Sequence, residues 1–172
     1  MNVTKKNRLY IFDASVFINL YLIDTRTFEL PQAIWDKLDE LMLEGKIISH
    51  RYVYDEVVTG SENPDKVSKW LQPRKSHFQL PTARQIEVIG IVVNAFPKLI
   101  DPNNEKDQAD PYLVAMGVEL NGLDASTEYV VVTLEKQAKT SGLAAACRSQ
   151  NVECITPAQF FDEVGIKIGV TI

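Results

Sequence analysis

The sequence has few cysteines, no excess of positive charge and no long uninterrupted apolar segment. Cys147 and Cys154 are the only cysteines among 172 residues, too few for a disulfide framework, and we expect both to be buried free thiols. The formal net charge is −5, which argues against a protein that holds nucleic acid on a broad basic surface. It does not exclude an enzyme that acts on nucleic acid, because a cluster of carboxylates binds cations.

The best candidate for a targeting segment follows Lys5, Lys6 and Arg8. A basic start followed by an apolar run is the order found in signal peptides, but Asp13 and Asn19 interrupt this run and no small-residue cleavage site follows. The run is also too short to span a bilayer. We therefore expect a cytoplasmic protein with no membrane partner.

Segments typical of buried strands alternate with segments typical of helices along the whole chain. The predicted strands are 8–13, 46–50, 76–80, 128–133 and 152–155, with 165–172 as a candidate edge strand. The predicted helices are 15–22, 31–44, 52–60, 64–72, 82–94, 110–120, a helix from after Thr133 to about Gln150, and 157–164. This alternation predicts an α/β fold of three layers, α/β/α, around a central parallel sheet of four to five strands. No repeat or linker divides the chain, so we expect residues 1–172 to form a single domain.

Acidic residues follow the predicted strands, where functional groups gather in open parallel sheets. Asp13 ends the first strand inside the apolar run LYIFDASVFINLYLI, and a carboxylate in such surroundings is costly unless something pairs with it. Thr133 ends the strand EYVVVT. Further acids come from this strand end and from two helices: Glu56, Asp107, Asp110 and Glu135.

Each of these acids also has an ordinary structural explanation. Asp110 suits a helix N-cap, Glu135 suits the positive end of a helix dipole, and Glu56 suits a solvated helix face. Asp13 differs because it ends a buried strand, where a side chain is not expected to be solvated. A structural role for Asp13 as the cap of the next helix stays open.

Four segments in order, YIFDASVFINL, YDEVV, DQADPYLVAMG and VVTLEKQ, resemble the four motifs of the PIN-domain nucleases. The resemblance covers residues 8–160, and the family includes the VapC-type toxins of bacterial toxin–antitoxin pairs. It implies a PIN-like α/β/α domain that cuts RNA with Mg²⁺ or Mn²⁺. By motif it assigns the four acids as Asp13, Glu56, Asp110 and Glu135, with Ser15 and Thr133 as supporting hydroxyls. Asp107, an extra acid one turn before Asp110, receives no fixed role.

Such a set of residues suits hydrolysis of an RNA phosphodiester. A divalent ion lowers the pKa of a bound water and offsets charge on the phosphate, and Mg²⁺ prefers oxygen ligands while keeping several waters. We expect Asp13 and Asp110 to be direct ligands, and Glu56 and Glu135 to act through water or to hold a second ion. The resemblance further implies a metal-dependent endoribonuclease that leaves 5′-phosphate and 3′-hydroxyl ends.

Two surfaces are candidates for partners. A basic patch could steer the RNA backbone or could be a solvated helix face: Lys66, Lys69, Arg74 and Lys75. The early helices carry more large apolar residues than one sheet face needs: Phe17, Leu20, Tyr21, Leu22, Ile34, Trp35, Leu38 and Met42. A groove between these helices could accept a helix of a cognate antitoxin or a second copy in a homodimer, or these residues could simply complete the core.

Three other readings of the residues stay open. A haloacid-dehalogenase-type phosphatase needs a second aspartate two residues after Asp13, where Ser15 stands instead. A receiver domain needs paired acids after the first strand, where Asp13 is flanked by Phe12 and Ala14. A catalytically inert PIN-like domain that only binds a partner is the third, although all four acidic motifs are filled.

Overall fold

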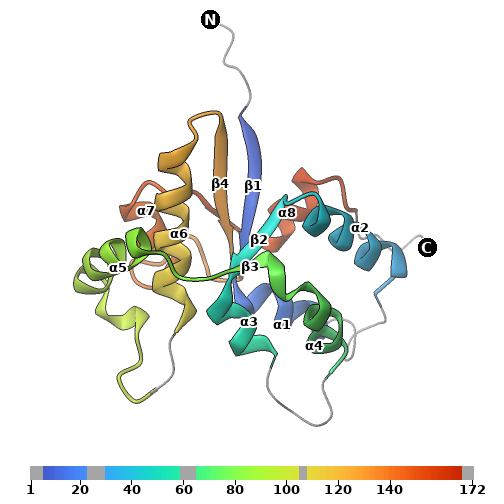
Figure 1. Ribbon diagram of the computed structural model, residues 1–172, viewed down its shortest axis with the longest axis horizontal. Helices are drawn as coiled ribbons and strands as arrows, with labels where there is room; N and C mark the ends of the chain where they lie inside the picture. Colours follow the sequence, from blue (N-terminus) through green and yellow to red (C-terminus); the bar gives the residue numbers. More distant parts are fainter. Residues whose placement is uncertain (1–5, 23–29, 59–64, 105–107, 168–172) are drawn as a thin grey trace, which may run out of the picture.

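A five-stranded, all-parallel sheet forms the centre of the computed structural model (Figure 1). The structure describes residues 6–22, 30–58, 65–104 and 108–167. The strands are β1 (Asn7–Phe12), β2 (Ile47–His50), β3 (Phe78–Gln79), β4 (Thr127–Val132) and β5 (Cys154–Ile155). Their order across the sheet is β3-β2-β1-β4-β5, and every pair is parallel.

Helices cover both faces of this sheet. They are α1 (Ala14–Leu22), α2 (Gln32–Leu43), α3 (Arg51–Val57), α4 (Lys66–Leu71), α5 (Ala83–Ala95), α6 (Ala109–Leu123), α7 (Leu143–Ser149) and α8 (Pro157–Glu163), with short 3₁₀ turns η2 (Gln72–His77) and η3 (Pro97–Leu99). α5, α6 and α7 lie on one side, and α2, α4 and α8 on the other (Figure 1). The predicted three-layer α/β/α fold is therefore confirmed.

Aromatic contacts join β1 to α1 and to α8. The ring centroid of Phe12 on β1 lies 5.5 Å from that of Phe17 on α1 and 4.8 Å from that of Phe160 on α8. All three side chains are almost completely buried. Burial of one such side chain contributes about 1.5–3 kcal/mol, so this cluster fixes where β1 ends relative to the helices around it.

Three predicted elements differ from the structure. Residues 133–142 form a loop instead of the first half of a helix, and α7 begins only at Leu143. The predicted strand 76–80 is reduced to Phe78–Gln79 because the preceding residues form η2, which has a proline in its first turn. In the predicted edge strand, 165–167 are not extended into the sheet, and 168–172 lie outside the described residues.

Of the two interpretations of the early helices, the structure supports the one in which their apolar residues complete the core. The large apolar residues of α1 and α2 are buried within the chain: Phe17, Leu20, Ile34, Trp35, Leu38 and Met42. Tyr21 and Leu22 are partly exposed. These buried residues belong to the hydrophobic core, so they offer no open groove to a partner.

The two thiols have different surroundings. Cys147 is buried, as predicted, whereas Cys154 at the edge strand β5 is only partly buried, and both are free. In the described part of the chain, no helix combines the length and the apolar character that a membrane crossing requires.

Candidate active site

Asp13 and Thr133 are brought together by the pairing of β1 with β4. Phe12 and Val132 are partners in this register, so the residues that follow them leave the sheet side by side. The backbone N–H of Asp13 donates to the carbonyl of Val132 at 3.0 Å. Asp13 therefore sits at a fixed point on the carboxyl edge of the sheet.

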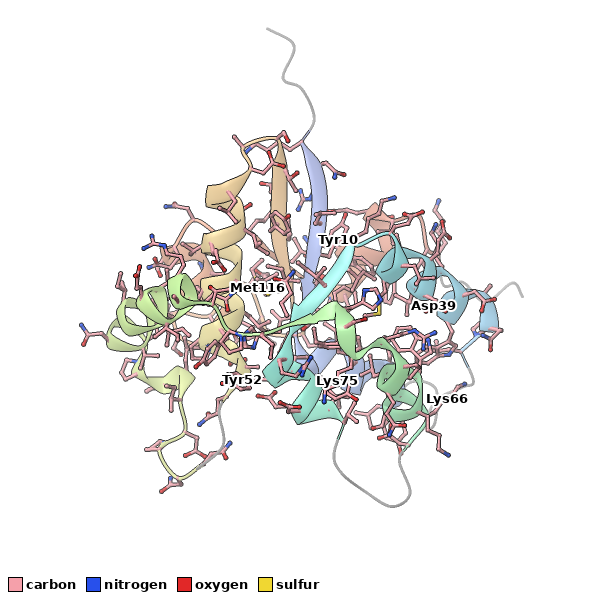
Figure 2. All side chains as sticks on the ribbon, in the orientation of Figure 1. Tyr10, Asp39, Tyr52, Lys66, Lys75 and Met116 are labelled. Carbon is pink, nitrogen blue, oxygen red and sulfur yellow. The ribbon has the colours of Figure 1, made fainter. Side chains whose placement is uncertain are left out.

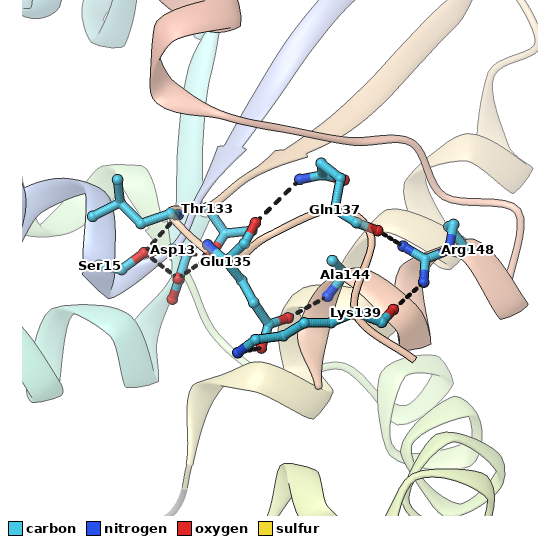
Figure 3. Close-up of polar contacts among 9 residues, drawn as sticks. Asp13, Ser15, Thr133, Glu135, Gln137, Lys139, Ala144 and Arg148 are labelled. Atoms are coloured by element: carbon cyan, nitrogen blue, oxygen red, sulfur yellow. Dashed lines mark hydrogen bonds and ion pairs between the residues drawn. The ribbon is translucent and has the colours of Figure 1, made fainter. Parts of the chain in front are cut away.

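Two hydroxyls bind the same oxygen of Asp13. Ser15 Oγ donates to Oδ2 at 2.5 Å and Thr133 Oγ1 donates to it at 2.7 Å (Figure 3). The side chain is 8% exposed, and these bonds compensate its loss of hydration. Oδ1 accepts no hydrogen bond from the residues that the structure describes, so one oxygen of Asp13 keeps its capacity to bind a ligand. Ser15 and Thr133, the predicted supporting hydroxyls, thus both contact Asp13.

Asp110 lies in the first turn of α6, two residues after its N-cap, Gln108. Its carboxylate accepts no hydrogen bond from the described residues. Its pKa is raised to about 7, first by burial and then by the negative charges of its neighbours, Asp13, Glu56 and Glu135. The structure thus places the four predicted acids close enough to influence one another electrostatically.

Glu56 connects α3 to the start of α6. Its Oε1 accepts a hydrogen bond of 2.9 Å from the backbone N–H of Ala109, which is one of the unpaired donors at a helix start. Loss of hydration raises the pKa of Glu56, the bond from Ala109 opposes this, and the charge of Asp13 raises it further. Glu56 therefore contributes to the fold as well as to the acidic rim.

Glu135 has a similar place at the start of α7. Its Oε2 accepts from the backbone N–H of Ala144 at 2.7 Å, and its Oε1 lies 3.4 Å from Lys139 Nζ (Figure 3). Gly142 makes this approach possible: its φ is +91°, and a Cβ there would collide with the Glu135 carboxylate. A helix through 134–142, as the sequence predicts, is incompatible with this arrangement.

The family model of DUF4411, a domain of unknown function, matches residues 10–168 of the chain. The chain belongs to this family. A comparison with curated proteins found no match. The family description assigns no activity, so the activity of this DUF4411 domain has to be argued from its own residues.

The carboxylates of the DUF4411 domain do not converge on one point as they stand. Among the described residues, no three His, Cys, Asp or Glu side chains are arranged to hold a metal ion. Glu56 and Glu135 turn toward backbone amides at two different helix starts. Asp107, the extra acid of the sequence prediction, lies outside the described residues.

The basic patch of the DUF4411 domain is largely engaged within the fold. Arg74 pairs with Asp39 at 2.5 Å and its guanidinium lies 4.6 Å from the ring of Trp70. Lys66 lies 5.4 Å from the ring of Trp35. These contacts favour a structural role for Arg74 and Lys66 over contact with RNA.

Two residues of this region were missed by sequence reasoning. Arg148 on α7 donates to the backbone carbonyls of Gln137 and Lys139 and so holds the 133–142 loop against α7 (Figure 3). His50 at the end of β2 is fully buried, stacks on Tyr112 of α6 at 4.8 Å, and accepts from the backbone N–H of Tyr52. Burial lowers the pKa of His50 to about 4, so it is neutral at pH 7. A single arginine or histidine outside any motif gives no sequence signal for such tertiary contacts.

Proposed function

We propose that this protein is a metal-dependent endoribonuclease that uses Mg²⁺ or Mn²⁺ at the carboxyl edge of its sheet. The observation that supports this most is the state of Asp110, a carboxyl that accepts no hydrogen bond from the described residues and whose pKa is raised to about 7 by burial and by three acidic neighbours. Clustered carboxylates repel one another, and a divalent cation is the partner that would stabilise them in the ionised form.

The donor set fits such an ion in its chemistry. Carboxylate oxygens are the ligands that Mg²⁺ and Mn²⁺ prefer. Asp13, through Oδ1, and Asp110 would hold the ion directly, whereas Glu56 and Glu135 would contact it through water. A bound ion would lower the pKa of a water molecule and offset the negative charge of an RNA phosphate.

The other residues have roles that do not depend on the ion. Ser15 and Thr133 both bond to Oδ2 of Asp13, which holds this carboxylate in one orientation. Among the described residues, none donates a hydrogen bond that Asp110 would have to give up before it turns toward a ligand. Glu56 and Glu135 hold the starts of α6 and α7 at the rim. A toxin role and a cognate antitoxin rest on the resemblance alone and add no residue to this proposal.

A second candidate is a catalytically inert PIN-like or receiver-like domain that binds a partner. The observation that favours it is that Glu56 and Glu135 each accept an amide hydrogen bond at a helix start, a role that needs no catalysis. The two candidate functions differ in whether the protein binds a divalent metal ion and cleaves RNA.

The deciding experiment measures cleavage of labelled single-stranded and hairpin RNA with Mn²⁺, Mg²⁺ or EDTA. We expect Asp13→Asn and Asp110→Asn each to lower the rate at least 100-fold while circular dichroism stays unchanged. Asp162→Asn on α8 carries the same charge change on an exposed position and is the matched control. Wild-type rates in both variants would reject the assignment of these residues. An inactive wild type that also binds no Mn²⁺ in calorimetry would favour the inert domain.

A further inference from the structure

A cavity of about 580 Å³ opens at the amino ends of the strands. It is bounded by the start of β1 and, on one side of the sheet, by α2 and the end of α8 (Figure 1). Its volume falls within the range of small-molecule sites, about 300–1,000 Å³. β1 runs from Asn7 at this cavity to Phe12 beside Asp13, so the cavity and the candidate active site lie at opposite ends of the same strand.

The charged side chains that line this cavity are mostly basic. They are Lys6, Arg8, Lys37 and Lys46, against one acid among the described residues, Glu163. Two groups already compensate this acid: Arg8 Nε lies 3.3 Å from Glu163 Oε2, and the Tyr10 hydroxyl donates to the same oxygen at 2.9 Å. Arg8 also pairs with Glu153 at 2.8 Å. Glu128 lies 3.7 Å from the same guanidinium, so Arg8 is surrounded by three carboxylates and adds no free positive charge to the cavity.

The lysines supply the positive charge that remains. Lys37 pairs with Glu40 at 2.9 Å and Lys46 pairs with Glu44 at 2.7 Å, and neither glutamate lines the cavity. The lysine side chains are 36% and 45% exposed. Ion pairs with this exposure are weak and exchange readily for another anion. Lys37 and Lys46 can thus turn toward a ligand in the cavity at little cost.

The rest of the lining suits an organic group. Leu41, Val164 and the ring of Tyr10 supply apolar surface next to the lysines. Tyr10, which is labelled in Figure 2, lies on the face of β1 that packs against α8. Its ring contacts that of Phe160 on α8, with 4.8 Å between the ring centroids. The cavity is also much larger than a single phosphate ion requires. A fitting ligand has a doubly charged end and an apolar body.

We propose that this cavity binds a phosphate monoester of about nucleoside size, with its phosphate between Lys37 and Lys46 and its organic group against Tyr10 and Leu41. Lysine ammonium groups are common partners of phosphate oxygens. The cavity contains none of the four acids of the candidate active site, so this inference does not depend on the proposed nuclease activity.

Calorimetry with AMP on the full chain tests the proposal, at low salt and with EDTA present so that no metal bridges AMP to the carboxylates. We expect Lys37→Gln and Lys46→Gln each to weaken binding at least fivefold, and the double variant to show no measurable binding. Lys98→Gln on η3 removes the same charge from an exposed position elsewhere and should bind as the wild type does. We expect inorganic phosphate to bind at least tenfold more weakly than AMP, and adenosine not to bind.

Nuclear magnetic resonance on the wild type locates the site without relying on any variant. AMP should shift the backbone amides of Lys46 and Val164 and leave those of Leu134 and Ala144 unchanged. Absence of binding at millimolar AMP would overturn the proposal. So would wild-type affinity in the double variant, equal affinity for phosphate and AMP, or shifts confined to Leu134 and Ala144.

Discussion

Asp13 shows how a charge is kept inside an apolar segment. Both hydroxyl donors act on Oδ2, at 2.5 Å from Ser15 and 2.7 Å from Thr133, and neighbouring backbone groups hold the residue at the end of β1. Hydrogen bonds to an ionised acceptor are among the stronger ones in proteins. Asp110 has the opposite surroundings, because it lies among acidic neighbours and accepts no hydrogen bond from the described residues.

Asp110 makes the stability of the metal-free protein depend on pH. Below pH 3.8, the ordinary value for this group, it is protonated in both folded and unfolded chains. As pH rises from there through the folded pKa of about 7, the unfolded chain releases the proton first, so the contribution of Asp110 to stability is lost. Asp110→Asn should raise the melting temperature in EDTA by about 2–4 °C or more at pH 8, and change it little near pH 4.

A melting series from pH 4 to pH 8 checks this. Asp162→Asn, the exposed control, should give the same difference from the wild type at every pH. A constant offset for Asp110→Asn across the series would show that the carboxyl titrates normally in the folded protein.

At the scale of elements, two helix starts depend on glutamates from elsewhere in the chain. Glu56 on α3 accepts from the Ala109 amide of α6, and Glu135 in the 133–142 loop accepts from the Ala144 amide of α7. The α6 N-cap residue, Gln108, makes no side-chain capping bond of its own. The start of α6 is therefore capped by Glu56 from another helix and not by its own N-cap residue.

Substitutions at Glu56 separate its structural role from its charge. Glu56→Ala removes the acceptor and should lower the free energy of unfolding by about 1 kcal/mol, the usual cost of a lost cap. Glu56→Gln keeps an oxygen acceptor and should cost much less. Urea unfolding measures both, with Asp55→Ala on the exposed neighbouring position as the control. Equal losses for alanine and glutamine would mean that the charge, not the acceptor, stabilises α6.

The 133–142 loop is held by Arg148. Its guanidinium donates to the carbonyls of Gln137 and Lys139 from an exposed position on α7. Arg148→Gln should free the loop and speed its cleavage by a lysine-specific protease at Lys136 or Lys139 severalfold, with little change in melting temperature. Arg84→Gln, which removes an exposed ion pair with Glu87 on α5, is the control. Unchanged cleavage would show that Glu135 and Gly142 hold the loop by themselves.

Across the whole molecule, the parallel sheet separates two groups of charged residues. The carboxyl ends of β1 and β4 carry Asp13 and the acids around it, and the amino end of β1 adjoins the lysine-lined cavity. All strands run in the same direction, so the residues that precede and follow them collect at different edges. The two proposed sites can therefore be tested independently.

A cation at the acidic edge should stabilise the whole fold. Binding to the folded state alone contributes about 2.7 kcal/mol at a hundredfold excess over Kd, which corresponds to roughly 5–10 °C for a chain of this size. We expect millimolar Mn²⁺ to raise the melting temperature, EDTA to reverse this, and Asp13→Asn to abolish it. Lys46→Gln at the other edge should leave the Mn²⁺ shift intact. No shift in the wild type would count against a metal site.

The sequence by itself determined the α/β class, the parallel sheet and most helix positions, because apolar periodicity and caps are local signals. Thr82 and Thr156 cap α5 and α8 as their local sequence predicts. The order of the acids along the chain also placed them at one edge of the sheet, since parallel strands share a direction.

Only the tertiary structure decided which groups these acids contact. Thr133 reaches Asp13 across 120 residues because β4 is the neighbour of β1, and strand order is not a local property. Residues 134–139 are good helix formers, yet they lie in a loop that is held by hydrogen bonds from Arg148 and by the positive φ of Gly142. Tertiary contacts therefore override local helix propensity here. The apolar residues of α1 and α2 became core for the same reason: what covers a face depends on the packing of all layers.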